Sequence, residues 1–186
     1  WQVAVSSAVA RRKMLALDAM KEPEYIRPIL LIQAENKNAT ATVDEVKNHL
    51  MKVDGVAENA IAQATGEIRE LDGVNLFDKD CKIEVIITKQ ALKEGWDCSF
   101  AYVFCSVAQV KSDKDIQQLL GRVLRMPYAT ERKQDSMSKA YAHVITTHFG
   151  KAAGELTQAL VDIGFNPMEA AAALGAAKTK PLPLLG

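Results

Sequence analysis

The sequence predicts an α/β fold in which a mainly parallel central sheet is flanked by helices in three layers. Segments with strand composition alternate with segments of helix composition along the chain, as in βαβ units. Most strand segments are apolar without alternation, which is typical of parallel strands buried on both faces. With 186 residues, 48% hydrophobic and 25% charged, the chain is long enough for one full core.

The N-terminal part predicts a helix followed by a buried strand. Residues 3–21 contain no Gly or Pro and predict a lead-in helix that ends before Pro23. The run ILLIQ at residues 29–33 follows Pro28 and predicts a strand buried on both faces, which implies a parallel sheet.

Helices and strands then alternate to the end of the chain. Thr42 and Glu45 form a capping box, which predicts a helix that runs to about Val53. The other predicted strands are residues 60–64, 83–87, 101–107 and 140–146, and the other predicted helices are residues 113–124, 151–163 and 167–174.

Charge and cysteine content narrow the class of protein. Basic and acidic residues number 23 each, so contacts with phosphates must come from local placement of basic residues. Cys81, Cys98 and Cys105 form no C-x-x-C pair, so we expect reduced thiols in a cytoplasmic protein and no metal site.

No apolar run approaches the roughly 18 to 20 residues of a membrane span. The chain lacks a signal peptide and starts at Trp1 without a methionine, so we expect a piece of a longer protein.

The most informative segment for function begins at Gln118 and reads QLLGRVLR. On a helix, Gln118, Arg122 and Arg125 project from one face, where two guanidinium groups suit the binding of a polyphosphate. Gly121 in mid-helix costs about 1 kcal/mol relative to alanine, which indicates close approach of a ligand or another backbone. The alternative is a solvated basic face with a tolerated glycine.

A second polar cluster follows the strand predicted at residues 83–87. Thr88 comes at the end of this strand, and Gly95, Trp96 and Asp97 form a turn further on. A hydroxyl group and free backbone N–H groups at the end of a parallel strand lie where α/β folds bind ligands. The alternative is structural, with Asp97 as a helix N-cap and Trp96 as a core anchor.

Taken together, these segments resemble the motifs of superfamily 2 helicases. Residues 118–125 resemble motif VI, Q-x-x-G-R-x-x-R, residues 85–97 resemble motif V, and residues 28–33 match the position of motif IV. The joint match covers about residues 28–147, in the order of a second RecA-like lobe. The resemblance implies a lead-in helix at residues 1–22, a RecA-like helicase C-terminal domain at 23–150, and a helical extension and tail at 151–186.

The resemblance also implies roles for individual residues. Arg122 and Arg125 would act as arginine fingers on the γ-phosphate of ATP bound to the other lobe. The implied residues are Gln118, Arg122 and Arg125 for catalysis, Gly95, Asp97 and Gly121 for the nucleotide, and Thr88, Gln33 and Asn36 for nucleic acid.

Within the superfamily, the runs TKQALKEGWDC and AYVFC and the motif VI segment are most similar to the restriction subunit of type III restriction-modification enzymes. This resemblance implies double-stranded DNA as the nucleic acid and a methyltransferase (modification) subunit as a further partner. DEAD-box RNA helicases carry His at the position of Gln118 and have a motif V that is one residue shorter. DEAD-box RNA unwinding is therefore the less favoured specialisation.

Two motifs of a complete motor are missing from the sequence. It contains no G-x-x-x-x-G-K-[ST] loop to hold phosphates and no D-E-x-H or D-E-x-D box to hold Mg²⁺. ATP and Mg²⁺ would therefore be held by an N-terminal RecA-like lobe outside this chain. The expected function is that of the second motor lobe of an ATP-dependent helicase or translocase, and the chain alone is expected to be inactive.

Two other classes of function stay open. One alternative is a metal-dependent nuclease, because the run Glu35-Asn36-Lys37 resembles the E-x-K half of such a site. The sequence contains no convincing upstream aspartate to complete that site. The second alternative is a RecA-like protein-interaction module without motor activity. His143 and His148 lie around the last strand without a nucleophile nearby in the sequence, so we interpret them as core or surface histidines.

Overall fold

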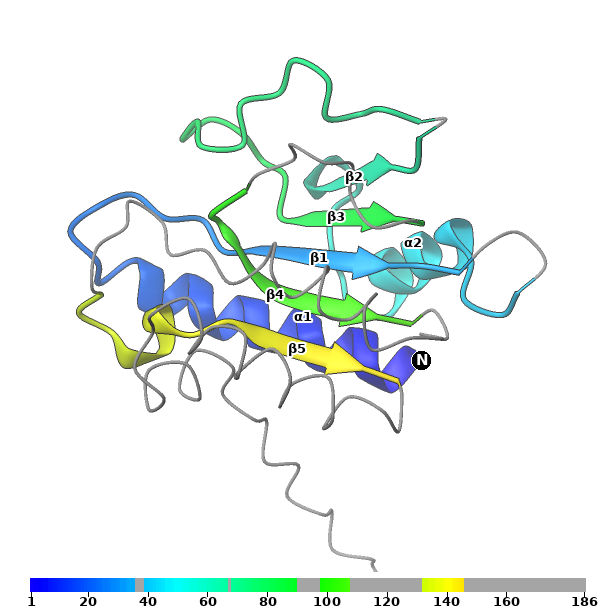
Figure 1. Cartoon of the computed structure of the whole chain (residues 1–186), viewed down its shortest axis with the longest axis horizontal. Helices are drawn as coiled ribbons and strands as arrows, with labels where there is room; N and C mark the ends of the chain where they lie inside the picture. Colours follow the sequence, from blue (N-terminus) through cyan, green and yellow to red (C-terminus); the bar gives the residue numbers. More distant parts are fainter. Residues whose placement is uncertain (36–38, 67, 90–97, 108–131, 146–186) are drawn as a thin grey trace, which may run out of the picture.

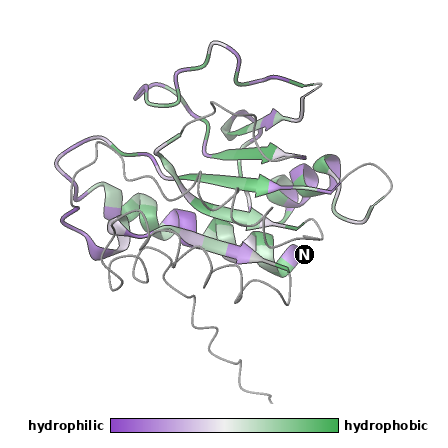
Figure 2. Ribbon diagram, in the orientation of Figure 1, coloured by the Kyte–Doolittle hydropathy of each residue, from purple (hydrophilic) through white to green (hydrophobic). Residues whose placement is uncertain are grey.

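The chain is built around a five-stranded sheet in which every pairing between the named strands is parallel (Figure 1). The computed structural model describes residues 1–35, 39–66, 68–89, 98–107 and 132–145. The strand order is β2-β3-β1-β4-β5, with β1 (Ile29–Gln33), β2 (Ile61–Ala64), β3 (Val85–Thr88), β4 (Ala101–Ser106) and β5 (Tyr141–Val144). The central strands are strongly hydrophobic along their length (Figure 2). The predicted α/β class with a parallel sheet is confirmed.

Two helices, α1 (Gln2–Ala19) and α2 (Val43–Lys52), contact each other and pack against the same face of the sheet (Figure 1). The helix α2 begins where the capping box predicts, because the Glu45 backbone N–H donates to the Thr42 Oγ1 at 3.3 Å. The shorter 3-10 helices are η1 (Glu58–Ala60), before β2, and η3 (Asp135–Ser138), before β5.

The strand β2 forms one edge of the sheet, and the segment that follows β2 folds back over its outer side. The chain turns at Gly66, whose φ of 89° favours glycine, and Ala64 then forms an isolated antiparallel bridge with Arg69. The Gln63 N–H donates to Glu70 Oε2 at 2.7 Å, and the Glu70 N–H donates to the Gln63 carbonyl at 3.1 Å. The outward-facing backbone groups of Gln63 are therefore satisfied within the chain.

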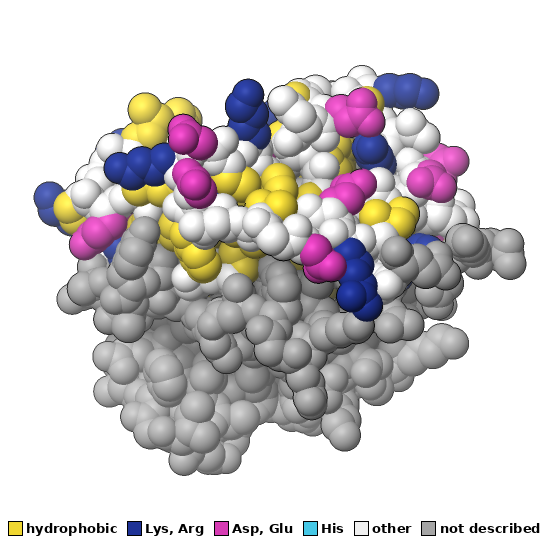
Figure 3. Space-filling model, turned by 90° about the horizontal axis from the view of Figure 1, so that it is seen from above, with side chains coloured by type: hydrophobic (Ala, Val, Ile, Leu, Met, Phe, Trp, Pro, Cys, Tyr) yellow, Lys and Arg dark blue, Asp and Glu magenta, His cyan; other side chains and the backbone are white. Residues whose placement is uncertain are grey.

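The surface on the β2 side mixes apolar, acidic and basic side chains (Figure 3). Ile68, Val74 and Phe77 are exposed apolar residues of the segment between β2 and β3. On the described part of this face, no broad area carries a single sign of charge. None of the helices within the described ranges has both the length and the apolar content to cross a membrane.

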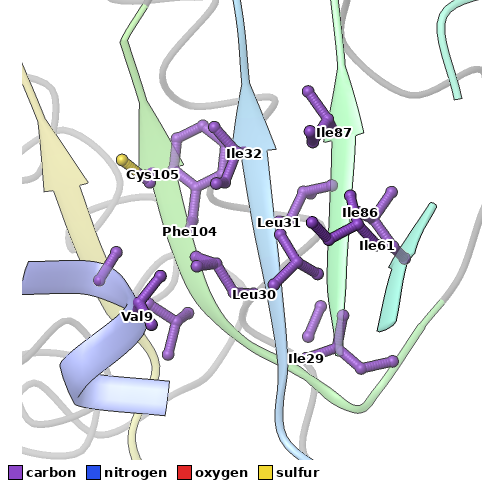
Figure 4. Packing of buried hydrophobic residues seen from close by; sticks show 14 of the residues in the cluster. Val9, Ile29, Leu30, Leu31, Ile32, Ile61, Ile86, Ile87, Phe104 and Cys105 are labelled. Carbon is purple, nitrogen blue, oxygen red and sulfur yellow. The ribbon is translucent and has the colours of Figure 1, made fainter. Parts of the chain in front are cut away.

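The core forms around β1, which lies between β3 and β4. Leu31 of β1 is in register with Ile86 of β3 and Phe104 of β4, and each of the three is at most 1% exposed (Figure 4). Val5 of α1 belongs to the same cluster of buried side chains. The lead-in helix and the sheet therefore share one core, and residues 151–186 lie outside the described residues.

The strands β2, β3 and β5 begin later than predicted, and for two of them other structure occupies the first predicted position. The strand β3 begins at Val85, since the Ile83 carbonyl accepts a hydrogen bond from Arg27 Nε at 2.9 Å. The strand β2 begins at Ile61 because Ala60 is the last residue of η1. The helices predicted at residues 113–124, 151–163 and 167–174 lie outside the described residues.

Candidate functional site at the carboxyl edge of the sheet

Three neighbouring strands end in polar residues at the carboxyl edge of the sheet. Gln33 ends β1, Thr88 ends β3 and Ser106 ends β4. The register pairs Gln33 with Thr88 on one side and with Ser106 on the other. Since directly paired residues of a sheet share a face, the three side chains form one line on the same face. Gln33, Thr88 and Ser106 are called the polar row below.

Hydrogen bonds connect the members of the polar row. The Ser106 hydroxyl donates to Gln33 Oε1 at 2.9 Å, an ordinary length for such a bond. The backbone continues the ladder, because the Ala34 N–H donates to the Thr88 carbonyl at 2.7 Å and the Val107 N–H donates to the Gln33 carbonyl at 3.0 Å. Ser106 is fully buried and Thr88 is 2% exposed, whereas Gln33 is partly exposed. Gln33 is therefore the member of the row that is accessible to a ligand.

The chain connections diverge at the polar row. The chain leaves β1 toward β2, at one end of the sheet, and it leaves β4 toward β5, at the other end (Figure 1). In open α/β sheets, ligands bind outside the carboxyl ends of the strands at such a point of divergence. The polar row thus occupies the position where this kind of fold places its ligands.

The three side chains of the polar row are neutral hydrogen-bonding groups. Two hydroxyls and one amide can donate and accept hydrogen bonds, which is what contacts with phosphate and sugar oxygens require. None of the three is an acid, a base or an activated nucleophile at neutral pH. This composition suits positioning of a ligand rather than acid–base chemistry.

Cys105 and His143 lie one residue before the edge on neighbouring strands, but they do not form a nucleophile–base pair. They are paired in the β4–β5 register, and Arg11 of α1 lies 4.6 Å from the ring centre of Tyr141, two residues before His143. Their side chains therefore point toward α1, away from the polar row. Burial raises the pKa of the Cys105 thiol to about 12, so this thiol stays protonated at neutral pH. Burial, and to a smaller extent the Arg11 guanidinium, lowers the pKa of His143.

Most of the residues that the sequence predicts for function lie outside the described residues. They are Gln118, Gly121, Arg122 and Arg125 of the motif VI segment, Gly95 and Asp97 of the motif V segment, and Asn36. His148, which is interpreted as a core or surface histidine, also lies outside the described residues. The structure does describe Gln33 and Thr88, and it places them side by side in register.

The polar row differs in two respects from the sequence-based expectation. The Thr88 side chain is 2% exposed, so the contact with nucleic acid predicted for it requires the groups that cover it to move, and that contact stays a prediction. Ser106 was not among the predicted site residues. The signal was present, because Ser106 ends a mainly apolar run, as Gln33 and Thr88 do.

Glu35, the residue on which the alternative nuclease hypothesis depends, has a structural role. Its Oε2 accepts a hydrogen bond from the Ala41 N–H at 3.0 Å, and its own N–H donates to the Ala41 carbonyl at 2.8 Å. The side chain thus closes the loop between β1 and α2. Within the part of the chain that the structure describes, no group of three or more His, Cys, Asp and Glu side chains has the arrangement of a metal site. Lys37 lies outside that part.

No protein-family model matches the sequence, and no curated protein matches it. Support for a function therefore comes from the residues of this chain and from the geometry of its sheet.

Proposed function

We propose that the chain is the second, C-terminal motor lobe of an ATP-dependent superfamily 2 helicase or translocase, similar to the restriction subunit of type III restriction-modification enzymes. The observation that carries the proposal is the pairing of Gln33 with Thr88. These residues end the two strands that resemble motifs IV and V, which are far apart in the sequence. In a lobe of this kind both motifs contact nucleic acid, so the proposal requires them to be neighbours at a ligand-binding edge.

Other parts of the enzyme would supply the groups that this chain lacks for ATP hydrolysis. An N-terminal RecA-like lobe would hold ATP and Mg²⁺, and Arg122 and Arg125 would reach the γ-phosphate from this chain. Double-stranded DNA would pass the carboxyl edge of the sheet. A methyltransferase subunit would complete the enzyme in the cytoplasm.

Substitution of the two arginines in the parent protein tests the proposal. Arg122→Ala or Arg125→Ala is expected to lower kcat for ATP hydrolysis by about a thousandfold or more, in the range of arginine fingers, while nucleotide affinity falls less. Arg122→Lys should restore little activity, because lysine keeps the charge but loses the planar fork of donors.

A control is Lys79→Ala, which removes an exposed basic residue that lies 5.8 Å from the ring centre of Tyr25, before the amino end of β1. This residue lies away from the carboxyl edge, so the variant should hydrolyse ATP like the wild type. Wild-type turnover in folded Arg122→Ala and Arg125→Ala variants would contradict the proposal. The chain alone should not hydrolyse ATP, and activity that follows it through purification would also count against the proposal.

A further inference from the structure

Ser106 holds the side-chain amide of Gln33 in a defined orientation. The Ser106 hydroxyl donates to Gln33 Oε1 at 2.9 Å, and Ser106 is fully buried. Because this bond occupies the oxygen end of the amide, the Nε2 end with its two N–H donors points away from Ser106. A buried serine thus determines which end of a partly exposed glutamine is available at the edge of the sheet.

We propose that Ser106 is a positioning residue, which makes Gln33 a fixed hydrogen-bond donor to the phosphate oxygens of a nucleic-acid backbone. The inference rests on the proposed function, which makes nucleic acid the ligand at this edge. Three features of the polar row support it: the row lies where the chain connections diverge, Gln33 is its accessible member, and it carries no negative charge. Amide N–H donors suit phosphate oxygens and read no base sequence.

Orientation matters because a glutamine amide has two unlike ends. The N–H end attracts a phosphate oxygen, whereas the carbonyl end repels it. An amide that is already fixed also loses less side-chain freedom when the ligand binds, which strengthens binding. Ser106 would therefore raise affinity without touching the nucleic acid.

Binding of the chain to a short fluorescein-labelled DNA duplex, measured by fluorescence anisotropy at low salt, tests this role. Gln33→Met keeps the size of the side chain and removes the donors, so the affinity should fall about tenfold. Gln33→Glu still accepts from Ser106 but replaces the donors by a negative charge, so its affinity should fall at least as far. Ser106→Ala lets the amide turn, and the affinity should fall about three- to tenfold. Low salt is needed because the row is neutral and its binding is expected to be weak, and contacts between basic groups and nucleic acid weaken as the salt concentration rises.

Ser136→Ala is the matched control. It removes a serine hydroxyl that donates to Asp18 Oδ2 at 2.7 Å, on the segment that precedes β5, away from the carboxyl edge. Its affinity for the duplex should equal that of the wild type. A loss as large as that of Ser106→Ala would overturn the proposal, because it would show that any lost serine hydroxyl weakens binding.

The double variant Gln33→Met/Ser106→Ala distinguishes positioning of the Gln33 amide by Ser106 from a general structural effect of the serine substitution. In the Gln33→Met background, Ser106→Ala should cause no further loss of affinity, because no amide remains to be oriented. Equal losses in both backgrounds would overturn the proposal. If Ser106→Ala does not fold, Gln33→Glu decides the question, and wild-type affinity of that variant would overturn the proposal.

Failure of this inference can be told apart from failure of the proposed function. Wild-type affinity in every Gln33 and Ser106 variant, or no binding by the wild-type chain, would overturn the role of the polar row. The proposed function would still stand if Arg122→Ala abolished ATP hydrolysis in the parent protein. Wild-type ATP turnover by that variant would overturn the proposed function and, with it, this inference.

Discussion

Arg12 shows how one side chain fixes a helix to the sheet. Its Nε donates to the Pro28 carbonyl at 3.0 Å, just before β1, and its guanidinium bonds Glu84 Oε2 at 2.5 Å, just before β3. Arg12 is 6% exposed, whereas the Glu84 side chain is 37% exposed. The amino ends of two neighbouring strands are thus held to α1 by a partly buried ion pair.

Arg12→Met is expected to lower the free energy of unfolding by roughly 2–4 kcal/mol. The loss of a buried partner leaves the Pro28 carbonyl and the Glu84 carboxylate without their donor, and the partial exposure of Glu84 reduces the cost. Urea denaturation measures the change. Lys13→Ala, at the next position on the exposed side of α1, removes only an exposed hydrogen bond from Lys13 Nζ to the Asp54 carbonyl at 2.9 Å, so it should change stability by about 0.5–1 kcal/mol. Similar losses in the two variants would contradict the role of the ion pair.

His143 should make stability depend on pH. Burial, and then Arg11, lowers its pKa below the ordinary value of 6.5, so the unfolded chain takes up a proton more readily than the folded chain. Stability is therefore lost as the pH falls from 6.5 toward the lowered pKa. His143→Gln does not titrate, so its free energy of unfolding should fall less than that of the wild type between about pH 7 and about pH 5. Parallel stability curves for the two proteins would show that His143 does not contribute.

The sequence predicts the presence of each strand better than it predicts the residues at which the strand begins and ends. Each of the five predicted segments contains a strand, and the pattern is clearest for β1, β3 and β4, because burial on both faces leaves an apolar run that is readable over a few residues. The ends depend on groups that are distant in the sequence. The bond from Arg27 to the Ile83 carbonyl delays the start of β3, and no local pattern indicates that bond.

The capping of α2 gives a prediction for one element. Thr42→Ala removes the Oγ1 that accepts the Glu45 N–H, so it should lower the free energy of unfolding by about 1 kcal/mol. Thr40→Ala is the matched control, since Thr40 is exposed and lies just outside the helix. Thermal unfolding followed by circular dichroism compares the two. A lower Tm for Thr40→Ala than for Thr42→Ala would contradict the assigned cap.

For the whole molecule, the sequence indicated the polar strand ends but not their arrangement. Gln33 and Thr88 were predicted to lie at ends of parallel strands, yet nothing local shows which strands are neighbours. The central strand β1 pairs with β3 and β4 rather than with β2, which follows it in the chain. Only this order brings Ser106 beside Gln33, and so the third member of the row could not be assigned from the sequence.

The covered edge of β2 has a consequence for aggregation. An open edge strand is a template on which strands of other molecules can pair. In β2, the outward N–H of Gln63 already donates a hydrogen bond to the Glu70 carboxylate, so it is not available for such pairing. Glu70→Ala should therefore aggregate faster than the wild type on mild heating, as measured by light scattering. Asp72→Ala removes the same charge from an exposed site and should aggregate like the wild type. Equal rates for the two variants would mean that net charge matters more than the closed edge. A carboxylate on the outer side of β2 would thus help to keep separate molecules from joining their sheets.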